Sequence, residues 1–456
     1  MFRSRPFRVL LAVLAVLLVA ASCSSRDDSD SSSGGGGSST TEASDGGSGG
    51  IDTADCPPDT NTAGIDGDTI TLASSFPQSG LTAAFAEISK GYKAYFQMVN
   101  EEEGGVDIGG KKYKIEVKDK DDEYNASKTV QNINDLVGVD GTGAFAVFNV
   151  VGTANNIAIR EKLGELCVPQ VFAATGAPAW GDPKYPWLIG STLPAYSLEG
   201  QAFANYLKEK KPDATVAMLV QDDEFGQDYE QGFKKAIEGT DIKVVKVEKY
   251  APGSSDVNSQ VTSLAATKAD AFFDGATLLA CPNALQQQKA ANWDAITWVS
   301  GTCISKTLMG IAGMNADKVI SSTNIQDPQN PAYADEAAMK DYKAKVKQYQ
   351  PDADVDNGIV AYGWTQGALM VETLKGLDTL GRAELMNALR SMDKVEGGLL
   401  LPGVSATTDG DEDPFMGETL QTVQYDAAAK HFNNIGDPLD YEGKTLELTP
   451  ENLVTG

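Results

Sequence analysis

Apolar residues along the chain recur at two spacings, one typical of strands and the other typical of helices. Residues 69–74 form a short apolar run that predicts a strand. The helix expected next has apolar residues three and four positions apart, at Phe85, Ile88, Tyr92, Tyr95, Phe96 and Val99. That spacing places them on one side of a helix, so we expect this side to be buried.

The alternation of strand and helix continues to residue 173. Further strands are expected at residues 113–117, 144–147 and 168–173, and further helices at residues 127–137 and 153–166. Pro183, Pro186 and Pro194 then interrupt the pattern. A strand, a helix and a second strand make a βαβ unit, and such units build parallel sheets covered by helices.

A second set of elements with the same alternation begins at residue 215. Its strands are expected at residues 215–220, 242–250, 269–274 and 297–300, and its helices at residues 226–238, 257–266 and 284–291. A strand at residues 319–323 and helices at residues 334–348 and 357–377 follow. The pattern therefore predicts an α/β protein with two doubly wound parallel-sheet lobes.

Doubly wound sheets bind ligands beyond the carboxyl ends of their strands. If two such edges face each other, the binding site is the cleft between them. The loops expected at these edges are residues 76–80, 148–153, 173–176, 222–226 and 275–277. Four of the five combine Gly with Ser or Thr, which suits close approach of backbone amides to an anionic group. The same residue types are also ordinary in turns and helix N-caps, so that alternative stays open.

The N-terminus has the anatomy of a secretory signal at residues 1–22. Arg3, Arg5 and Arg8 precede an apolar run that is shorter than the roughly 20 residues of a membrane-spanning helix. Residues 19–23 resemble a bacterial lipobox, which makes Cys23 the expected lipidated N-terminus, although Ala20 stands where Leu is usual. Signal cleavage without lipidation is the alternative. Residues 23–55 are then expected to be the lipidated cysteine and a disordered Ser/Gly tether.

Composition and charge narrow the classes of partner. The formal net charge of −27 argues against a nucleic-acid partner, because a phosphate-binding surface needs an excess of Lys and Arg. The acidic runs at residues 121–123 and 409–413 lack the ligand spacing of a calcium loop. We therefore expect neither a metal nor another cofactor.

The cysteine count indicates an oxidising compartment. If Cys23 is lipidated, four cysteines remain, and they allow three disulfide pairings. We prefer Cys281 with Cys303, because each follows the end of a predicted neighbouring strand, and this leaves Cys56 with Cys167.

The sequence carries no motif of a nucleophilic or nucleotide-dependent enzyme. It has no G-x-S-x-G elbow between a predicted strand and helix and no Walker loop, and its single histidine, His431, lies in a polar stretch. We therefore expect a binding protein rather than an enzyme.

Two stretches of the chain resemble a known family. Residues 70–80, with Gly91, Tyr92, Asn100 and residues 104–106 after them, are similar to the opening of the branched-chain amino-acid-binding family of ABC transporter receptors. Residues 220–228 resemble that family's second-lobe loop. The similarity extends from about residue 66 to the mid-430s.

The resemblance implies a type I periplasmic-binding-protein fold, in which three crossings of the chain between two lobes form a hinge. Lobe 1 is then expected at residues 66–191 and 323–397, and lobe 2 at residues 192–322 and 398–456. Closure of the hinge on a ligand is the expected mechanism.

The resemblance also implies positions for the ligand. A ligand carboxylate is expected near Val151, Gly152, Thr153, Ala174 and Thr175. Further expected wall positions are Phe76, Ser79, Tyr196, Asp223, Phe225 and Ala276. Amino-acid-binding members place an acidic residue just after the Gly275 region to pair with the ligand ammonium, whereas this chain has Ala276 there. Asp223, Glu224 or Asp274 could substitute, so amino acids, other small carboxylates, amides and aromatic acids remain open.

The expected protein is thus a monomeric extracytoplasmic receptor. It would be anchored to the cell membrane at Cys23, capture a small organic molecule and deliver it to an ABC transporter permease. The alternative is a sensor that uses the same two-lobed clamp to report to a signalling partner.

Overall fold

The computed structural model describes residues 50–445. The expected signal, Cys23, most of the expected tether and the last residues of the expected second lobe lie outside the described residues. The Ile51 backbone N–H donates a hydrogen bond to Asn387 Oδ1 at 2.7 Å, and the Ile51 side chain packs on the core. The folded body therefore includes the end of the stretch that was expected to be tether.

The first sheet is built from the N-terminal strands. These are β1 (Ile65–Asp66), β2 (Thr69–Phe76), β3 (Val106–Ile108), β4 (Lys111–Asp121), β5 (Ala146–Phe148), β6 (Gln170–Ala173) and β7 (Leu188–Gly190). Their order is β3-β4-β2-β5-β6-β7, with β1 paired to β2. Strand β2 runs parallel to both β4 and β5, so the sheet grows from β2 in two directions.

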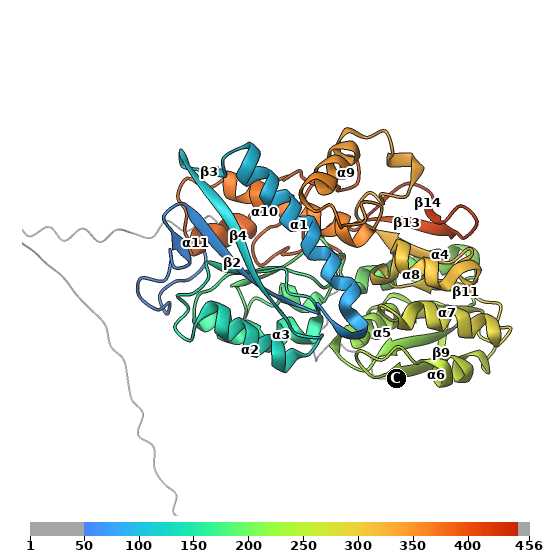
Figure 1. The fold of residues 1–456 in the computed structure, drawn as a ribbon. Helices are drawn as coiled ribbons and strands as arrows, with labels where there is room; N and C mark the ends of the chain where they lie inside the picture. Colours follow the sequence, from blue (N-terminus) through green and yellow to red (C-terminus); the bar gives the residue numbers. More distant parts are fainter. Residues whose placement is uncertain (1–49, 446–456) are drawn as a thin grey trace, which may run out of the picture. The chain divides into compact units, whose positions relative to one another are not determined.

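Helices cover both sides of this sheet (Figure 1). They are α1 (Glu87–Glu102), α2 (Ala126–Val137), α3 (Thr153–Glu165), α9 (Ala337–Tyr349), α10 (Gly358–Lys375) and α11 (Arg382–Leu389). Helices α1 and α10 make the closest approach, because a Cβ atom at Gly363 would lie 1.9 Å from the carbonyl oxygen of Ile88. We call the first sheet with these helices lobe 1.

The second sheet has a mainly parallel core. Its strands are β8 (Thr215–Gln221), β9 (Lys243–Tyr250), β10 (Ala271–Gly275), β11 (Ile296–Val299), β12 (Ile320–Thr323), β13 (Thr419–Asp426), β14 (His431–Asn434) and β15 (Leu439–Asp440). Their order is β14-β13-β12-β11-β10-β8-β9, with β15 paired to β13. Strands β8 to β12 pair in parallel, whereas β13 pairs antiparallel with β12 and β14.

The second sheet also carries helices on both sides, with an apolar core on each. They are α4 (Tyr196–Lys210), α5 (Glu224–Ala236), α6 (Asn258–Ala265), α7 (Ala280–Ala290) and α8 (Lys306–Ala312). We call this sheet with its helices lobe 2. Within residues 50–445, no helix is both long enough and apolar enough to cross a bilayer.

The chain passes between the lobes three times, from β7 to α4, from β12 to α9 and from α11 to β13. The fold predicted from the sequence, two doubly wound α/β lobes with three crossings, is confirmed. Helix α4 was not predicted, because its first turns are buried almost all round and show no single apolar face.

Two disulfides join distant parts of the chain. Cys56 pairs with Cys167 at a Cα–Cα distance of 5.5 Å, and Cys281 pairs with Cys303 at 6.2 Å. These are the two pairs preferred from the sequence. The first ties the N-terminal segment to the end of α3, and the second joins the start of α7 to the loop after β11.

Candidate functional site

A cavity lies between the two lobes, beyond the carboxyl ends of strands from both sheets. Its wall comes from the loops after β4, β5, β6, β7, β10, β11 and β12, and from the starts of α1, α3, α4, α5 and α10. Its volume is about 110 Å³. A single buried water needs roughly 10–15 Å³ on this measure, so the cavity has room for about ten non-hydrogen atoms. Open α/β sheets bind ligands at this position.

The lobe 1 wall combines apolar side chains with the N-terminus of a helix. Val151, Gly152 and Thr153 lead from β5 into α3, and Val151 bridges Ala174 at the end of β6. The first backbone N–H groups of an α-helix have no partner within the helix and attract anions. This wall can therefore bind a carboxylate without a cationic side chain.

Hydroxyl groups surround this helix terminus. Thr153 Oγ1 lies 2.5 Å from Thr175 Oγ1, and the Tyr196 hydroxyl donates to Thr175 Oγ1 at 3.1 Å. Tyr196 begins α4, and its ring packs against Phe225 and Tyr229 of α5 with centroids 4.9 and 4.6 Å away. Tyr196 is thus held by lobe 2 and hydrogen-bonded to lobe 1, beside the cavity.

Tyr124 lines the cavity from the loop between β4 and α2. Its φ of 60° and the φ of 51° at Glu123 are left-handed, which is unfavourable for non-glycine residues. Such a conformation persists only where the surroundings enforce it.

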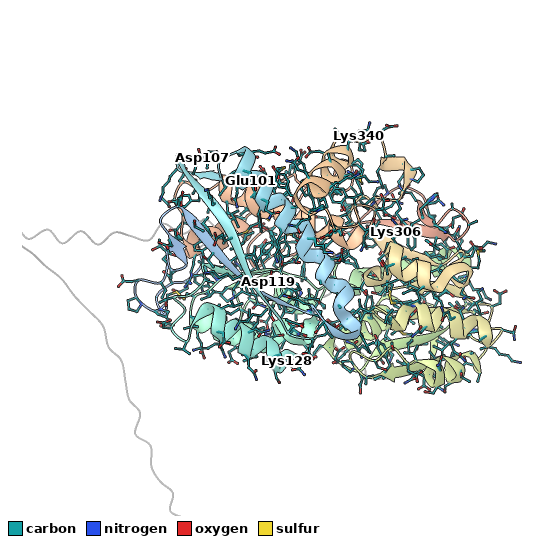
Figure 2. The ribbon with its side chains drawn as sticks, viewed as in Figure 1. Glu101, Asp107, Asp119, Lys128, Lys306 and Lys340 are labelled. Carbon is teal, nitrogen blue, oxygen red and sulfur yellow. A yellow bond between two sulfur atoms is a disulfide. The ribbon has the colours of Figure 1, made fainter. Side chains whose placement is uncertain are left out.

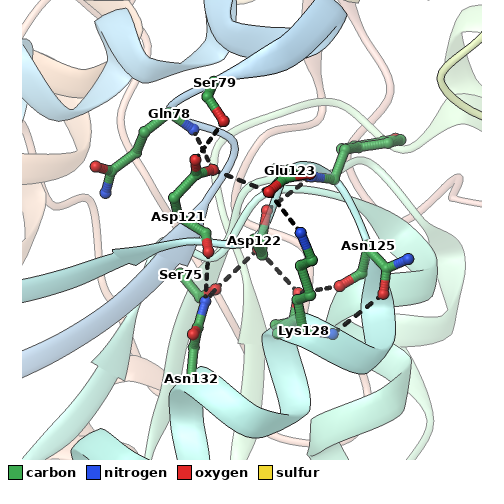
Figure 3. Close-up of polar contacts among 11 residues, drawn as sticks. Ser75, Gln78, Ser79, Asp121, Asp122, Glu123, Asn125, Lys128 and Asn132 are labelled. Atoms are coloured by element: carbon green, nitrogen blue, oxygen red, sulfur yellow. Dashed lines mark hydrogen bonds and ion pairs between the residues drawn. The ribbon is translucent and has the colours of Figure 1, made fainter.

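Two aspartates hold Glu123 and Tyr124 in this backbone conformation (Figure 3). The fully buried Asp122 accepts hydrogen bonds from the Ser75 hydroxyl at 2.8 Å, the Thr129 hydroxyl at 2.8 Å and the Tyr124 N–H at 2.9 Å. Asp121 accepts from the Ser79 hydroxyl at 2.5 Å and from the N–H groups of Gln78 and Glu123 at 2.8 and 2.9 Å. The acidic run at residues 121–123 therefore shapes a turn.

Gly152 is required by the same arrangement. Its φ is 102°, and an added Cβ would lie 2.9 Å from the ring of Tyr124 and 2.6 Å from Asn155 Oδ1. Any side chain at this position would push Tyr124 away from the start of α3.

The lobe 2 wall carries a buried carboxylate, Glu199 of α4. One of its oxygens accepts from the Tyr229 hydroxyl at 2.8 Å, and the other accepts from the Gly301 N–H at 2.8 Å. Glu199 is 2% exposed, and burial raises its pKa to about 7. Tyr229 continues through the Ser300 hydroxyl, 2.6 Å away, to Thr302, which also lines the cavity.

A second carboxylate, Asp327, lines the cavity just beyond β12. It accepts a hydrogen bond from the Gln329 N–H at 2.9 Å, and burial raises its pKa to about 6. The described residues that line the cavity include no lysine, arginine or histidine. The remaining wall is largely apolar, with Phe85, Ile88, Leu193, Ile304, Ile325 and Ile359.

The structure brings most of the predicted ligand positions to this cavity. Six of them line it, namely Val151, Gly152, Thr153, Ala174, Tyr196 and Phe225. Thr175 lies behind them, hydrogen-bonded to Thr153 and Tyr196.

Four predicted positions lie elsewhere. Phe76 is buried in the lobe 1 core and Ala276 in the lobe 2 core. Ser79 is exposed and bonds Asp121, while Asp223 caps α5 by accepting from the Gly226 N–H at 3.2 Å. Ser79 and Asp223 therefore hold neighbouring turns, and neither side chain lines the cavity.

The wall features that were not predicted from the sequence include Tyr124, Glu199, Asp327 and the turn at Gly301 and Thr302. Glu199 lies in the helix that the apolar pattern missed. Tyr124 follows an acidic run that was considered only for metal binding. One feature of the sequence could have located Tyr124. A helix begins at residue 126, so Tyr124 lies in the loop at the carboxyl end of β4, where such sheets bind ligands.

The chain was compared with known protein families. Residues 69–430 match the model of the periplasmic binding protein family. The chain belongs to this family. The resemblance noted at residues 70–80 and 220–228 is therefore confirmed. The protein is an extracytoplasmic ligand-binding protein.

A leucine-, isoleucine-, valine-, threonine- and alanine-binding protein of Pseudomonas aeruginosa is 25% identical over 276 residues, which are 59% of this chain and 70% of the relative.

Two solved structures show the same fold. A branched-chain amino-acid ABC transporter protein of Thermus thermophilus with bound valine has a TM-score of 0.71 at 15% identity, covering 82% of this chain and 97% of its own. A fatty-acid ABC transporter substrate-binding protein of Thermomonospora curvata has a TM-score of 0.71 at 18% identity, covering 86% and 98%.

Proposed function

We propose that the protein captures a small organic molecule in the cavity between its lobes and delivers it to an ABC transporter permease. The observation that carries the proposal is the cavity itself, which joins the ligand-binding edges of two doubly wound sheets. Membership of the periplasmic binding protein family supports the same role.

Contacts between the lobes support hinge closure as the way the ligand is held. The Tyr196–Thr175 hydrogen bond joins the lobes beside the cavity. Away from it, Lys306 Nζ of α8 lies 2.9 Å from Asp354 Oδ2, between α9 and α10 (Lys306 is labelled in Figure 2). A ligand that touches both walls would favour this closed arrangement and so display one surface to the permease.

The size and lining of the cavity indicate the ligand class. Room for about ten non-hydrogen atoms, an apolar wall and a helix N-terminus suit a small carboxylate with a hydrocarbon part. The names of the relatives, which bind branched-chain amino acids or fatty acids, agree with such a ligand.

The N-terminal segment fits an extracytoplasmic receptor held at a membrane. We propose that residues 1–22 are removed, that Cys23 is lipidated and that the tether lets the monomeric body reach its permease. The proposed lobe boundaries lie at residues 191–192, 322–323 and 397–398.

A thermal-shift screen tests the proposal. Amino acids, aliphatic acids and aromatic acids are added to the protein, and a ligand at 100 times its dissociation constant should stabilise it by about 2.7 kcal/mol. Ala174→Phe, which fills the cavity, should abolish the shift, whereas Ala428→Phe at an exposed site should preserve it. A shift that persists in Ala174→Phe would contradict binding in this cavity.

A further inference from the structure

Glu199 differs from the other buried glutamate that has a raised pKa. Glu418 is 2% exposed, but its carboxylate accepts hydrogen bonds from the N–H groups of Gly443 and Thr445 at 2.7 and 3.0 Å, and from the Thr445 hydroxyl. It therefore anchors the C-terminal segment. Glu199 accepts one hydrogen bond on each oxygen, has the Trp298 side chain beside it, and borders a cavity.

The hydroxyl network behind Glu199 favours its ionised form. The Tyr229 hydroxyl donates to Glu199, so its own lone pairs are free to accept from Ser300, 2.6 Å away. On the far side, Ser300 accepts from the Thr302 N–H at 3.1 Å. Donors thus point toward the carboxylate from α5 and from the loop after β11, and a hydrogen bond to the charged form of an acid favours that form.

No cation offsets this charge among the described residues. The described wall of the cavity has no basic side chain. Burial is the largest effect on the pKa of Glu199 and raises it, and no basic neighbour lowers it. The other wall acid, Asp327, differs because His431 and Lys343 lie close enough to lower its pKa. A buried carboxylate without a cation is costly, and a positive group in the cavity would remove that cost.

The position of Glu199 suits a ligand with two charged ends. The start of α3 and the hydroxyls of Thr153 and Tyr196 lie on the lobe 1 side, where a carboxylate can bind. Glu199 and Gly301 line the cavity from lobe 2. The acidic residue that the resemblance placed after Gly275 is absent, and the neighbouring Thr277 reaches the same network, with its Oγ1 3.1 Å from Thr302 Oγ1.

We propose that Glu199 binds the amine nitrogen of the ligand and so selects amino acids over carboxylates that lack an amine. This inference rests on the proposed function and narrows its ligand class. Asp223, Glu224 and Asp274, the substitutes considered from the sequence, do not line the cavity.

Matched pairs of ligands test the inference. Isothermal titration compares L-leucine with 4-methylpentanoate, L-phenylalanine with 3-phenylpropanoate and L-alanine with propanoate. In each pair the second compound lacks only the amine. We expect the wild-type protein to bind the amino acid of at least one pair at least 100-fold more tightly than its partner acid.

Variants separate an amine contact from a structural role. Glu199→Gln should weaken binding of that amino acid by at least 100-fold and change binding of the partner acid by less than threefold. A structural role would weaken both equally, and that result would overturn the inference. Glu418→Gln is a matched change at a buried acid that does not line the cavity, and it should alter the affinity for neither ligand. Loss of amine preference in Asp327→Asn with its retention in Glu199→Gln would assign the role to Asp327 instead.

The wild-type protein alone also decides the question if Glu199→Gln does not fold. Equal or tighter binding of the partner acid in every pair would overturn the role of Glu199 and leave the proposed function intact. If none of the six compounds binds, the role of Glu199 is also overturned. The proposed function itself would fail only if the wider ligand screen showed no stabilisation.

Discussion

Asp122 accepts a hydrogen bond from the backbone N–H of Tyr124 at 2.9 Å, and this contact connects a fully buried acid to the wall of the cavity. Asp122→Ala would leave that N–H and the Ser75 hydroxyl without their acceptor, while the Thr129 hydroxyl would keep only the Asn125 carbonyl oxygen, 3.2 Å away. Each buried donor that loses its partner costs about 1–3 kcal/mol. We expect the free energy of unfolding, measured by urea denaturation, to fall by at least about 2 kcal/mol.

Asp135→Ala provides the control for this change, because Asp135 is exposed and pairs only with Lys120 at the surface. Its effect should stay within about 0.5 kcal/mol. Equal stability of Asp122→Ala and Asp135→Ala would contradict the role of Asp122 in holding the loop.

Gly152 and Gly164 offer a matched pair within α3. Gly152→Ala should weaken ligand binding at least tenfold and lower stability by about 1–3 kcal/mol, because its φ is left-handed and the added Cβ meets the Tyr124 ring. An added Cβ at Gly164 has no heavy atom within 4 Å, so Gly164→Ala should be neutral or slightly stabilising. Titration calorimetry and thermal melting measure both effects, and full affinity in Gly152→Ala would argue against contact between α3 and Tyr124 at the site.

Burial raises the pKa of Glu418 to about 7, which makes stability depend on pH. The folded state holds this proton more tightly than the unfolded state does. The stabilisation is therefore complete below the ordinary pKa of about 4.3 and is lost as pH rises through 7, with a limit of roughly 3 kcal/mol. Asp413 lies beside Glu418 and adds to the effect.

We expect the melting temperature of the unliganded protein to fall between pH 5.5 and pH 8, and to fall less in Glu418→Gln. Glu101→Gln, at an exposed position labelled in Figure 2, serves as the control and should behave like the wild type. A pH profile of Glu418→Gln that matches the wild type would show that this carboxyl does not titrate in that range.

Much of the fold followed from the apolar pattern. Helix α1 has its buried residues at the expected helical spacing, and strand β2 is buried on both faces, as its continuous apolar run indicates. The loop at residues 148–153 followed from the rule that such sheets bind ligands beyond the carboxyl ends of their strands, and the family resemblance narrowed it to residues 151–153.

Tyr124, Glu199 and Gly301 could not be located in the same way. They come from three separate stretches of chain, and only the packing of two lobes brings them to one cavity. The helix that carries Glu199 has polar residues on its buried surface, Ser197 and Glu199, which hide its periodicity.

The ion pair of Lys306 with Asp354 gives a test of lobe closure. Lys306→Gln should weaken ligand binding about twofold to fivefold at low salt, since a partly exposed pair contributes about 0.2–1 kcal/mol. The difference should vanish at high salt. Lys340→Gln removes a similar charge from an exposed pair with Asp335 that lies within lobe 1, and it should not change affinity. Equal affinity of both variants at low salt would show that the Lys306 pair does not favour the closed state.

A crystal structure of the protein with a ligand found in the thermal-shift screen tests the binding site most directly. We expect electron density for one ligand between the two lobes, in contact with Thr153 at the start of α3 and with Gly301 after β11. Density for that ligand at another surface, with only water in this cavity, would contradict the proposed function.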